Sequence, residues 1–311
     1  MIRKIFLFAA VIVLSTNMNL FAQNEKDSTD ENWDDEKWLN WNDYEWFHWE
    51  FHGKPFMEVN YGFGKADHKK LKSNFADNGL LELKLGHSSR SSYYNENIIH
   101  FSEKYIFGSR FRADLKSSSV KFDEMRSGLW RFGFAKREGY AYKIKNFSIM
   151  PYNSSGFVWS RLDMIDYPAK FYYLTNPPMS LDDAVNDTEI LNRFHDAFRF
   201  GTVNEGGIKL DISSAVSINV SYEGAVIFPR HLVWKHLGSM IIEEGAKHFL
   251  DNFIDEVSDS SPYATPIVDF LLNNGLSYAF FTLKKDRMNW PFATEEPLTY
   301  EMIKFGITVT F

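Results

Sequence analysis

The sequence predicts an all-β fold, an antiparallel transmembrane β-barrel of eight to ten strands with a helical insertion. Residues 304–311 alternate polar and apolar side chains and end on Phe311. In a barrel, such alternation places one set of side chains against lipid and the other in the lumen. Aromatic residues make up 17% of the chain, yet no segment after residue 22 has the ~18 consecutive apolar residues of a spanning helix. We therefore expect the chain to span the membrane as a closed barrel, which pairs every backbone group.

Residues 1–22 are predicted to be a signal peptide. A positively charged start precedes an apolar run from Ile5 to Leu14, which is shorter than the roughly 20 residues of a spanning helix. Cleavage is expected after Ala22. The chain has no cysteine, which argues against a lipid anchor on a terminal cysteine and against disulfides in the oxidising compartment. The expected location is the cell outer membrane.

Residues 23–55 are predicted to form an acidic, tryptophan-rich periplasmic arm. Five of the nine tryptophans lie here, at Trp33, Trp38, Trp41, Trp46 and Trp49. Acidic residues fill the gaps, and on a helix the five indoles would spread over a wide arc. The arm could dock at the membrane interface, where tryptophan is favoured, or bind a partner by stacking. A tether that packs under the barrel mouth is the favoured interpretation.

Residues 56–311 are predicted to form the barrel, because apolar side chains recur at every second position, as in strands. The clearest runs start at Met57, Leu81, Ile99, Ile208, Val216 and Ile303. Trp130–Phe134 and Tyr140–Ile144 are predicted to be two strands joined by a turn at Lys136–Gly139. Leu276–Phe280 is predicted to be another strand. With a weak run at 155–163 the count is nine or ten, whereas a barrel with both ends in the periplasm needs an even number.

Two insertions, at about 165–202 and 230–274, are predicted to be helical. The first is predicted to contain a short helix that begins at Ser180, an N-cap with acids in the following turn, and runs to about Phe198. The second is predicted to contain two helices, roughly Leu232–Val257 and Thr265–Leu272. Its apolar surface has to be covered, so the insertion could plug the lumen, lie on the membrane surface or bind another protein. Self-packing as a cap over one barrel mouth is the favoured interpretation.

The carboxy-terminal strand resembles the β-signal of bacterial outer-membrane proteins. That signal reads polar, any, Gly, any, any, hydrophobic, any, aromatic, and Lys304, Gly306, Val309 and Phe311 fill its fixed positions. Residues 206–222 also resemble a hairpin of the small OmpA-type barrels, and the composition resembles that of Bacteroidetes surface proteins. The resemblance implies that the four residues are an assembly signal. It also implies outer-membrane lipids and the barrel assembly machinery as partners.

Motifs that carry enzyme chemistry are missing from the sequence, which has no nucleotide loop, metalloprotease helix or nucleophile elbow. We therefore predict no catalytic, cofactor-binding or metal site. His87 and Ser89 resemble the histidine and serine that lipid A deacylases place two residues apart on a strand, which makes a lipid-modifying enzyme the least favoured alternative. Glu244 and His248 are the one pair of metal-ligand types at helical spacing, which is a weak signal.

The predicted function is a structural or surface-interaction role in the outer membrane. A barrel of ten strands has little lumen once side chains fill it, which argues against a wide pore. A narrow channel or a transporter of small or lipophilic solutes is the alternative. The formal charge is −7 and the chain has no long basic run, so nucleic acid is not an expected partner.

Overall fold

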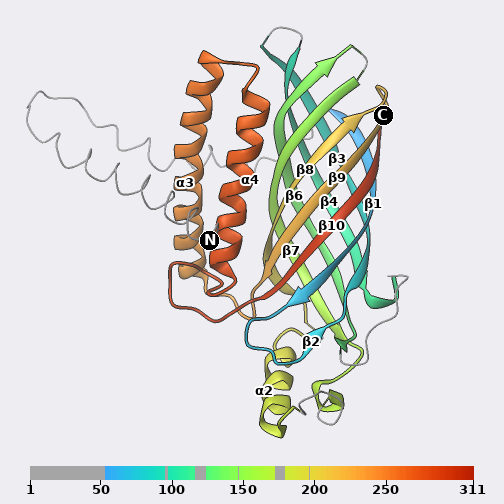
Figure 1. Ribbon diagram of the computed structural model, residues 1–311, viewed down its shortest axis with the longest axis vertical. Helices are drawn as coiled ribbons and strands as arrows, with labels where there is room; N and C mark the ends of the chain where they lie inside the picture. Colours follow the sequence, from blue (N-terminus) through green and yellow to red (C-terminus); the bar gives the residue numbers. More distant parts are fainter. Residues whose placement is uncertain (1–52, 95–96, 116–123, 146, 172–178, 196) are drawn as a thin grey trace, which may run out of the picture. The chain divides into compact units, whose positions relative to one another are not determined.

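The computed structural model describes residues 53–94, 97–115, 124–145, 147–171, 179–195 and 197–311. The predicted signal peptide, 1–22, lies outside these residues, and so does the predicted arm, 23–55, except for its last three residues. The described chain is dominated by long antiparallel strands that form one closed sheet (Figure 1).

Eight strands make up the barrel. They are β1 (Lys54–Asp67), β3 (Asn78–Tyr94), β4 (Ile98–Arg112), β6 (Ser127–Ile144), β7 (Phe147–Met164), β8 (Arg199–Asp211), β9 (Val216–Ile227) and β10 (Leu298–Thr310). Their order around the wall is β1-β10-β9-β8-β7-β6-β4-β3, and the wall is closed because β1 pairs with β3 on one side and with the last strand, β10, on the other. Every neighbouring pair is antiparallel. The predicted fold class is confirmed, with eight strands.

Alternating polarity explains which side of each strand faces inward. On β1, Val59 and Tyr61 are exposed on the outside, whereas Glu58 and Asn60, which alternate with them, are buried in the lumen. Strand β10 follows the same rule, with Phe305 exposed and its neighbours buried. Because strand side chains alternate with a period of two, the register of these two strands puts their apolar residues largely outside and their central charged residues inside.

The two ends of the barrel differ in their connections. At one end, here the terminal end, β1 begins and β10 stops, and the connections 95–97, 145–146 and 212–215 are two to four residues long. At the opposite end, here the loop end, all four connections are longer. An even strand number with short turns beside both termini is the arrangement of outer-membrane barrels. It resolves the parity of the predicted count.

Two strand predictions are wrong. The predicted turn at Lys136–Gly139 lies inside the unbroken strand β6, where Lys136 pairs with Ser155 and Arg137 pairs with Ser154 of β7. The sequence looks like a turn there because both faces of β6 are polar at this level. The predicted strand Leu276–Phe280 belongs to a helix.

The loop-end connections contain the helices. They are η2 (Ala113–Leu115), η3 (Pro168–Phe171), α2 (Leu181–Asn192), α3 (Val233–Ser260) and α4 (Thr265–Lys284). Ser180 caps α2, because its Oγ accepts a hydrogen bond from the backbone N–H of Asp183. A small parallel pair, β2 (Asn74–Phe75) and β5 (Glu124–Met125), lies at the same end. Among the described residues, no helix is both long and apolar enough to cross a membrane.

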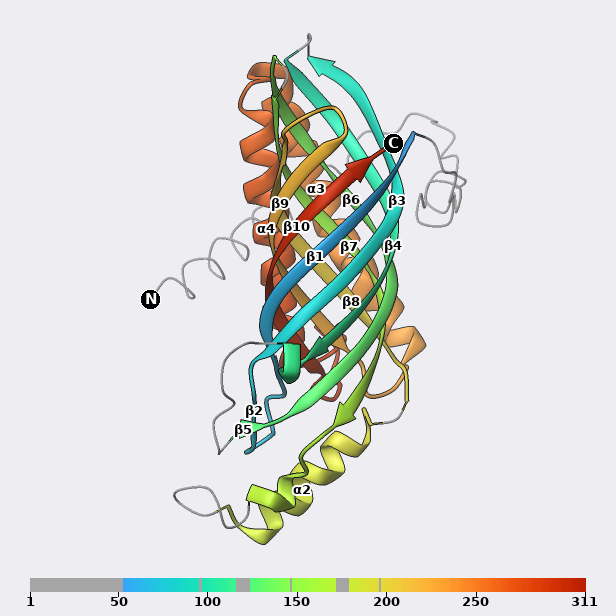
Figure 2. The same cartoon turned by 90° about the vertical axis from the view of Figure 1, so that its right-hand side faces the viewer.

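Helices α3 and α4 form an antiparallel hairpin that stands against the outside of the barrel wall (Figures 1 and 2). Helix α4 contacts strands β6, β7, β8 and β9. The hairpin therefore neither plugs the lumen nor caps a mouth, so the favoured interpretation of 230–274 is wrong. Its position follows from a polar helix face that matches a polar sector of the wall. Helix α4 also runs 12 residues beyond the predicted end at Leu272.

Candidate functional site

The barrel lumen is filled by charged side chains of both signs. The buried carboxylates of its central part are Glu58, Glu82, Glu103, Glu205 and Glu223, and the buried cations are Lys84, Arg131, Arg137, Lys209 and Lys304. These ten residues come from seven strands, all except β7, and each residue occupies an inward position of its strand. Five negative and five positive groups balance, as buried charges must to offset the loss of water.

Arg137 joins the carboxylates of three different strands. Its Nη1 lies 2.9 Å from Glu58 Oε2 and 2.8 Å from Glu103 Oε2, and its Nη2 lies 3.3 Å from Glu205 Oε1. Lys209 adds a second cation to Glu103 at 2.6 Å. These charge-assisted bonds cross the lumen and tie opposite walls together.

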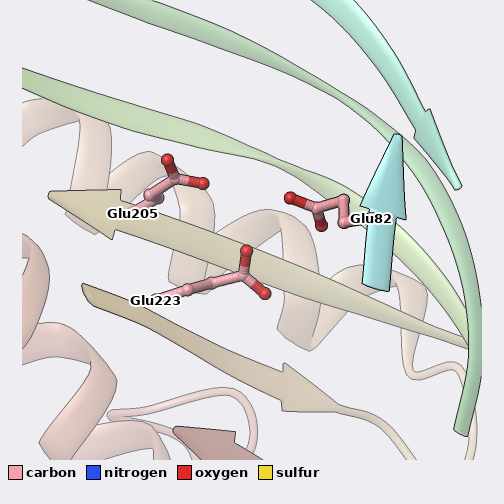
Figure 3. Close-up of side chains that lie close together, drawn as sticks. All are labelled: Glu82, Glu205 and Glu223. Atoms are coloured by element: carbon pink, nitrogen blue, oxygen red, sulfur yellow. The ribbon is translucent and has the colours of Figure 1, made fainter. Parts of the chain in front are cut away.

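Three carboxylates converge on one point, as a metal site would require. Ligand oxygens of Glu82, Glu205 and Glu223 lie within 4.8 Å of one another, and Figure 3 shows the three side chains directed toward each other from β3, β8 and β9. The ammonium group of Lys304 lies among them, with Nζ 3.0 Å from Glu82 and 2.5 Å from both Glu205 and Glu223. This cation takes the place that a metal ion would occupy.

Aromatic rings fill the remaining space of the lumen. The Lys84 ammonium lies 4.8 Å from the ring centre of Tyr105, and the Arg131 guanidinium lies 4.4 Å from that of Tyr300. The cavity left among these side chains has a volume of about 10 Å³, which is room for about one water molecule. The described lumen therefore has no continuous aqueous path at this level.

A hydrophobic seal closes the lumen toward the loop end. Its strand residues include Leu80, Phe111, Leu129, Leu162 and Leu298, all fully buried. Phe75, Met125, Leu191 and Phe194 from the loop-end connections pack on the same cluster. Nearer the terminal end, Phe101, Ala141, Met150 and Tyr152 form a second buried cluster.

Described residues of the loop-end connections form a cap over the seal. Buried Asp187 of α2 accepts backbone hydrogen bonds from Lys72 at 3.1 Å and Ser73 at 2.7 Å. In another connection, Arg126 Nε lies 2.9 Å from Asp166 Oδ2. Hydrogen bonds from the Arg126 side chain hold the pKa of Asp166 well below its usual range. The cap is fixed by such bonds in addition to its apolar contacts.

The four residues of the predicted assembly signal lie on both faces of β10 and at its end. Lys304 is fully buried in the lumen network. Gly306 also faces inward, where a Cβ atom would come within 1.9 Å of Asn60 Oδ1. Val309 is half-buried on the outside, and Phe311 is 70% exposed, with its backbone N–H donating to the Pro55 carbonyl at 2.9 Å.

The other candidate pairs have different surroundings. His87 and Ser89 share the outward face of β3, and Ser88 between them is buried. In register, His87 lies opposite Pro55 and Lys104. Glu244 and His248 are both exposed on α3, and Glu244 also lines a small cavity between the hairpin and the wall.

The network of paired charges in the lumen was not predicted from the sequence. A signal for it was present, because charged residues recur at the inward positions of several strands, such as Glu82 with Lys84 and Glu205 with Lys209. Inward charges of both signs on several strands indicate a paired interior. The sequence does not show which of them meet across the lumen.

No protein-family model and no curated protein matches this chain. Among solved structures, neisserial surface protein A (NspA) is similar at 9% identity and a TM-score of 0.38, covering 83% of this chain and 97% of that one. Ail, the attachment invasion locus protein of Yersinia pestis, is similar at 7% identity and a TM-score of 0.31, covering 84% and 99%. Both scores are low, and the strand pairing of this chain alone defines its architecture.

Proposed function

We propose that this chain is an outer-membrane protein whose barrel anchors a cap at the cell surface and conducts no solute. The observation that carries the proposal is the combination of an apolar outer belt with a lumen filled by paired charges. An apolar belt suits lipid, and a filled lumen leaves the outer surfaces as the places where a partner can bind. The cap formed by the described loop-end residues is such a surface outside the bilayer.

The alternative of a narrow channel or transporter has less support. A conducting path would have to cross the hydrophobic seal at the loop end and the ion pairs around Arg137 and Lys304. Opening it would separate several buried ion pairs, each costing several kcal/mol to break. The third alternative, a lipid-modifying enzyme, would need a base beside Ser89 and a stabilised oxyanion.

Single-cysteine labelling tests the location and orientation, because the chain has no cysteine of its own. Asn186 of α2 is exposed at the loop end, and Ser214 is exposed in the turn between β8 and β9 at the terminal end. Intact cells that carry Asn186→Cys should react with a membrane-impermeant maleimide. Cells that carry Ser214→Cys should react only after the outer membrane is permeabilised.

The two positions act as controls for each other, since both variants expose one thiol on the same folded protein. Labelling of neither variant in intact cells would contradict a surface location. Labelling of Ser214→Cys but not Asn186→Cys would contradict the proposed orientation, with the loop end outside the cell.

We also propose that β10 is the segment that the barrel assembly machinery recognises. The exposed Phe311 at the end of an outward apolar face supports this role, because a partner can reach it before the barrel closes. Strand β10 also forms the closing pair with β1, so its late pairing would leave it free for recognition. Outer-membrane lipids are the other expected partner.

A further inference from the structure

The hairpin α3–α4 turns polar residues toward the barrel and apolar residues outward. On α4, the buried polar residues are Thr265, Asp269, Asn273 and Lys284, and the main apolar exceptions, Phe280 and Phe281, lie near the loop end. On the opposite side, Ile267, Leu271 and Tyr278 are 54%, 61% and 56% exposed. A surface helix of a water-soluble protein has the reverse arrangement.

The barrel wall beneath the hairpin is polar as well. Outward residues Lys136, Ser155 and Asn204 are neighbours across β6, β7 and β8, and Glu138 and Asn153 form the next outward pair. On β1, β3 and β10, by contrast, the exposed outward residues include Met57, Val59, Tyr61, Phe63, Leu81, Leu83, Leu85, Ile303, Phe305 and Ile307. Charged side chains on a lipid-facing strand cost up to about 2–4 kcal/mol each. The polar sector therefore needs a polar cover.

Specific bonds join the two polar faces. Lys247 Nζ of α3 lies 3.2 Å from Glu138 Oε1 of β6. Asn153 Nδ2 of β7 donates to Ser277 Oγ of α4 at 3.1 Å. Both bonds would be lost if the hairpin moved away from the wall, although Glu138 would keep Lys136 of its own strand, at 2.8 Å.

Two glycines let α4 approach the wall closely. A Cβ atom on Gly206 of β8 would lie 2.1 Å from Asn274 Oδ1, and one on Gly224 of β9 would lie 3.2 Å from the Phe281 ring. Small residues at the contact between two elements allow close packing within lipid. The hairpin is thus fitted to this sector of the wall.

The hairpin runs the full height of the barrel, as Figure 2 shows. It starts at the loop end, and its tip reaches the terminal end, where Tyr142 Oη donates to the Tyr263 carbonyl and Ser258 Oγ lies 2.6 Å from Tyr93 Oη. The 20 residues of α4 span about 30 Å at 1.5 Å per residue. This length equals the thickness of the hydrocarbon core of a bilayer, about 30 Å.

We propose that the hairpin lies within the bilayer beside the barrel and that lipid acyl chains cover its outward face. The inference rests on the proposed outer-membrane location. Acyl chains are the occupant because the outward residues, Ile241 and Phe249 of α3 with Ile267 and Leu271 of α4, continue the apolar belt of the uncovered strands. The perimeter that meets lipid is then part strand and part helix.

The distribution of charge on α3 agrees with this placement. Three of its four exposed acids, Asp255, Glu256 and Asp259, lie in its last turns, beside the hairpin tip at the terminal end. The fourth, Glu244, lies in the middle of the helix and lines the cavity between the hairpin and the wall. Charged residues are favoured near the bilayer surface rather than at its centre. Glu243 is paired with Lys284 between the two helices, away from the outward face.

Fluorescence quenching by lipids tests the proposal. Leu271→Cys and Leu83→Cys would each carry an environment-sensitive probe, and full mature protein would be folded into phosphatidylcholine vesicles with or without bromine on the acyl chains. Position 83 reports the uncovered barrel wall, and Ser214→Cys reports water. We expect a blue-shifted emission and the loss of at least half of the intensity in brominated vesicles at both 271 and 83. Ile267→Cys replaces Leu271→Cys if the latter does not fold.

The outcomes separate this inference from the proposed function. Quenching at 83 with water-like emission at 271 would overturn the hairpin placement and leave the barrel in the membrane. A blue shift without quenching at 271 would mean that protein covers the face, and would also overturn it. Water-like emission at both positions in folded protein would defeat both proposals.

Discussion

Lys304 contacts three of the five central carboxylates of the lumen with a single ammonium group. Burying an ion costs several kcal/mol, and partners at short distance with good geometry are needed to offset that cost. The lumen meets the requirement with equal numbers of cations and anions. Each charge is therefore stabilised only as long as its partners remain.

Replacing Lys304 with Met should lower the free energy of unfolding by about 3–5 kcal/mol, because Glu82, Glu205 and Glu223 would share a buried space without their common cation. Urea unfolding in lipid vesicles, followed by tryptophan fluorescence, measures the change. Lys143→Met, which removes an exposed lysine at the end of β6, is the matched control and should have little effect. Equal stability of both variants would contradict the role of Lys304.

Deleting Phe311 should lower the amount of assembled protein in cells, because the proposed recognition residue is lost while the lumen contacts of β10 remain. Immunoblots of membrane fractions, with and without heating, measure the folded form. Phe311→Tyr keeps an aromatic ring and should restore assembly. Normal levels of folded, membrane-inserted protein after the deletion would defeat the proposed signal.

Residue roles were the part that the sequence predicted least. Lys304 was assigned to the polar position of the predicted β-signal. The sequence could not show its contacts, because its three partners lie 81 to 222 positions away along the chain. Such partners are set by the order and stagger of the strands. The alternating pattern of the final strand predicts that Lys304 points into the lumen, but the pattern does not identify the carboxylates that pair with it.

At the scale of elements, the hairpin β8–β9 and the final strand were predictable, because each repeats apolar residues at a period of two over a long run. Strand β6 was not, because Arg137 serves the lumen while Lys136 and Glu138 face the helical hairpin. A segment that is polar on both faces looks like a turn. In α4, the apolar residues at 276, 278 and 280 have the spacing of a strand. Three positions are too few to distinguish the period of two of a strand from the period of 3.6 of a helix.

The cap should loosen in mild acid because of His68. Its ring packs edge-on to Phe194 at 6.0 Å, and this burial lowers the pKa of His68 despite the nearby carboxylates of Asp67 and Glu296. The unfolded connection then binds a proton more readily than the folded one, so stability falls as the pH drops below about 6.5. Hydrogen exchange of residues 69–77 at neutral and mildly acidic pH measures the loosening.

The control for the cap is His68→Gln, whose side-chain oxygen can still accept the hydrogen bond that Lys70 N–H donates to His68. This variant should show the same exchange rates at both pH values. An acid-induced increase of the same size in the variant would assign the effect to another group.

At the scale of the whole molecule, three layers follow one another outward from the axis: paired charges in the lumen, the strand wall, and an apolar surface. On one side the wall itself provides that surface, and on the other side the helical hairpin stands in front of a polar wall (Figure 1). The lumen is closed by charge pairing in its middle and by apolar packing toward the loop end. This arrangement supports the proposal that the barrel is a membrane anchor for its cap.

The most direct test of the sealed barrel is the electrical conductance of the folded protein in a planar lipid bilayer. Folding would first be verified by a heat-dependent shift in gel mobility. We predict currents equal to those of the protein-free bilayer, because ion pairs and the hydrophobic seal leave no continuous path. Reproducible current steps from the wild-type protein would contradict the sealed lumen and would favour the narrow channel.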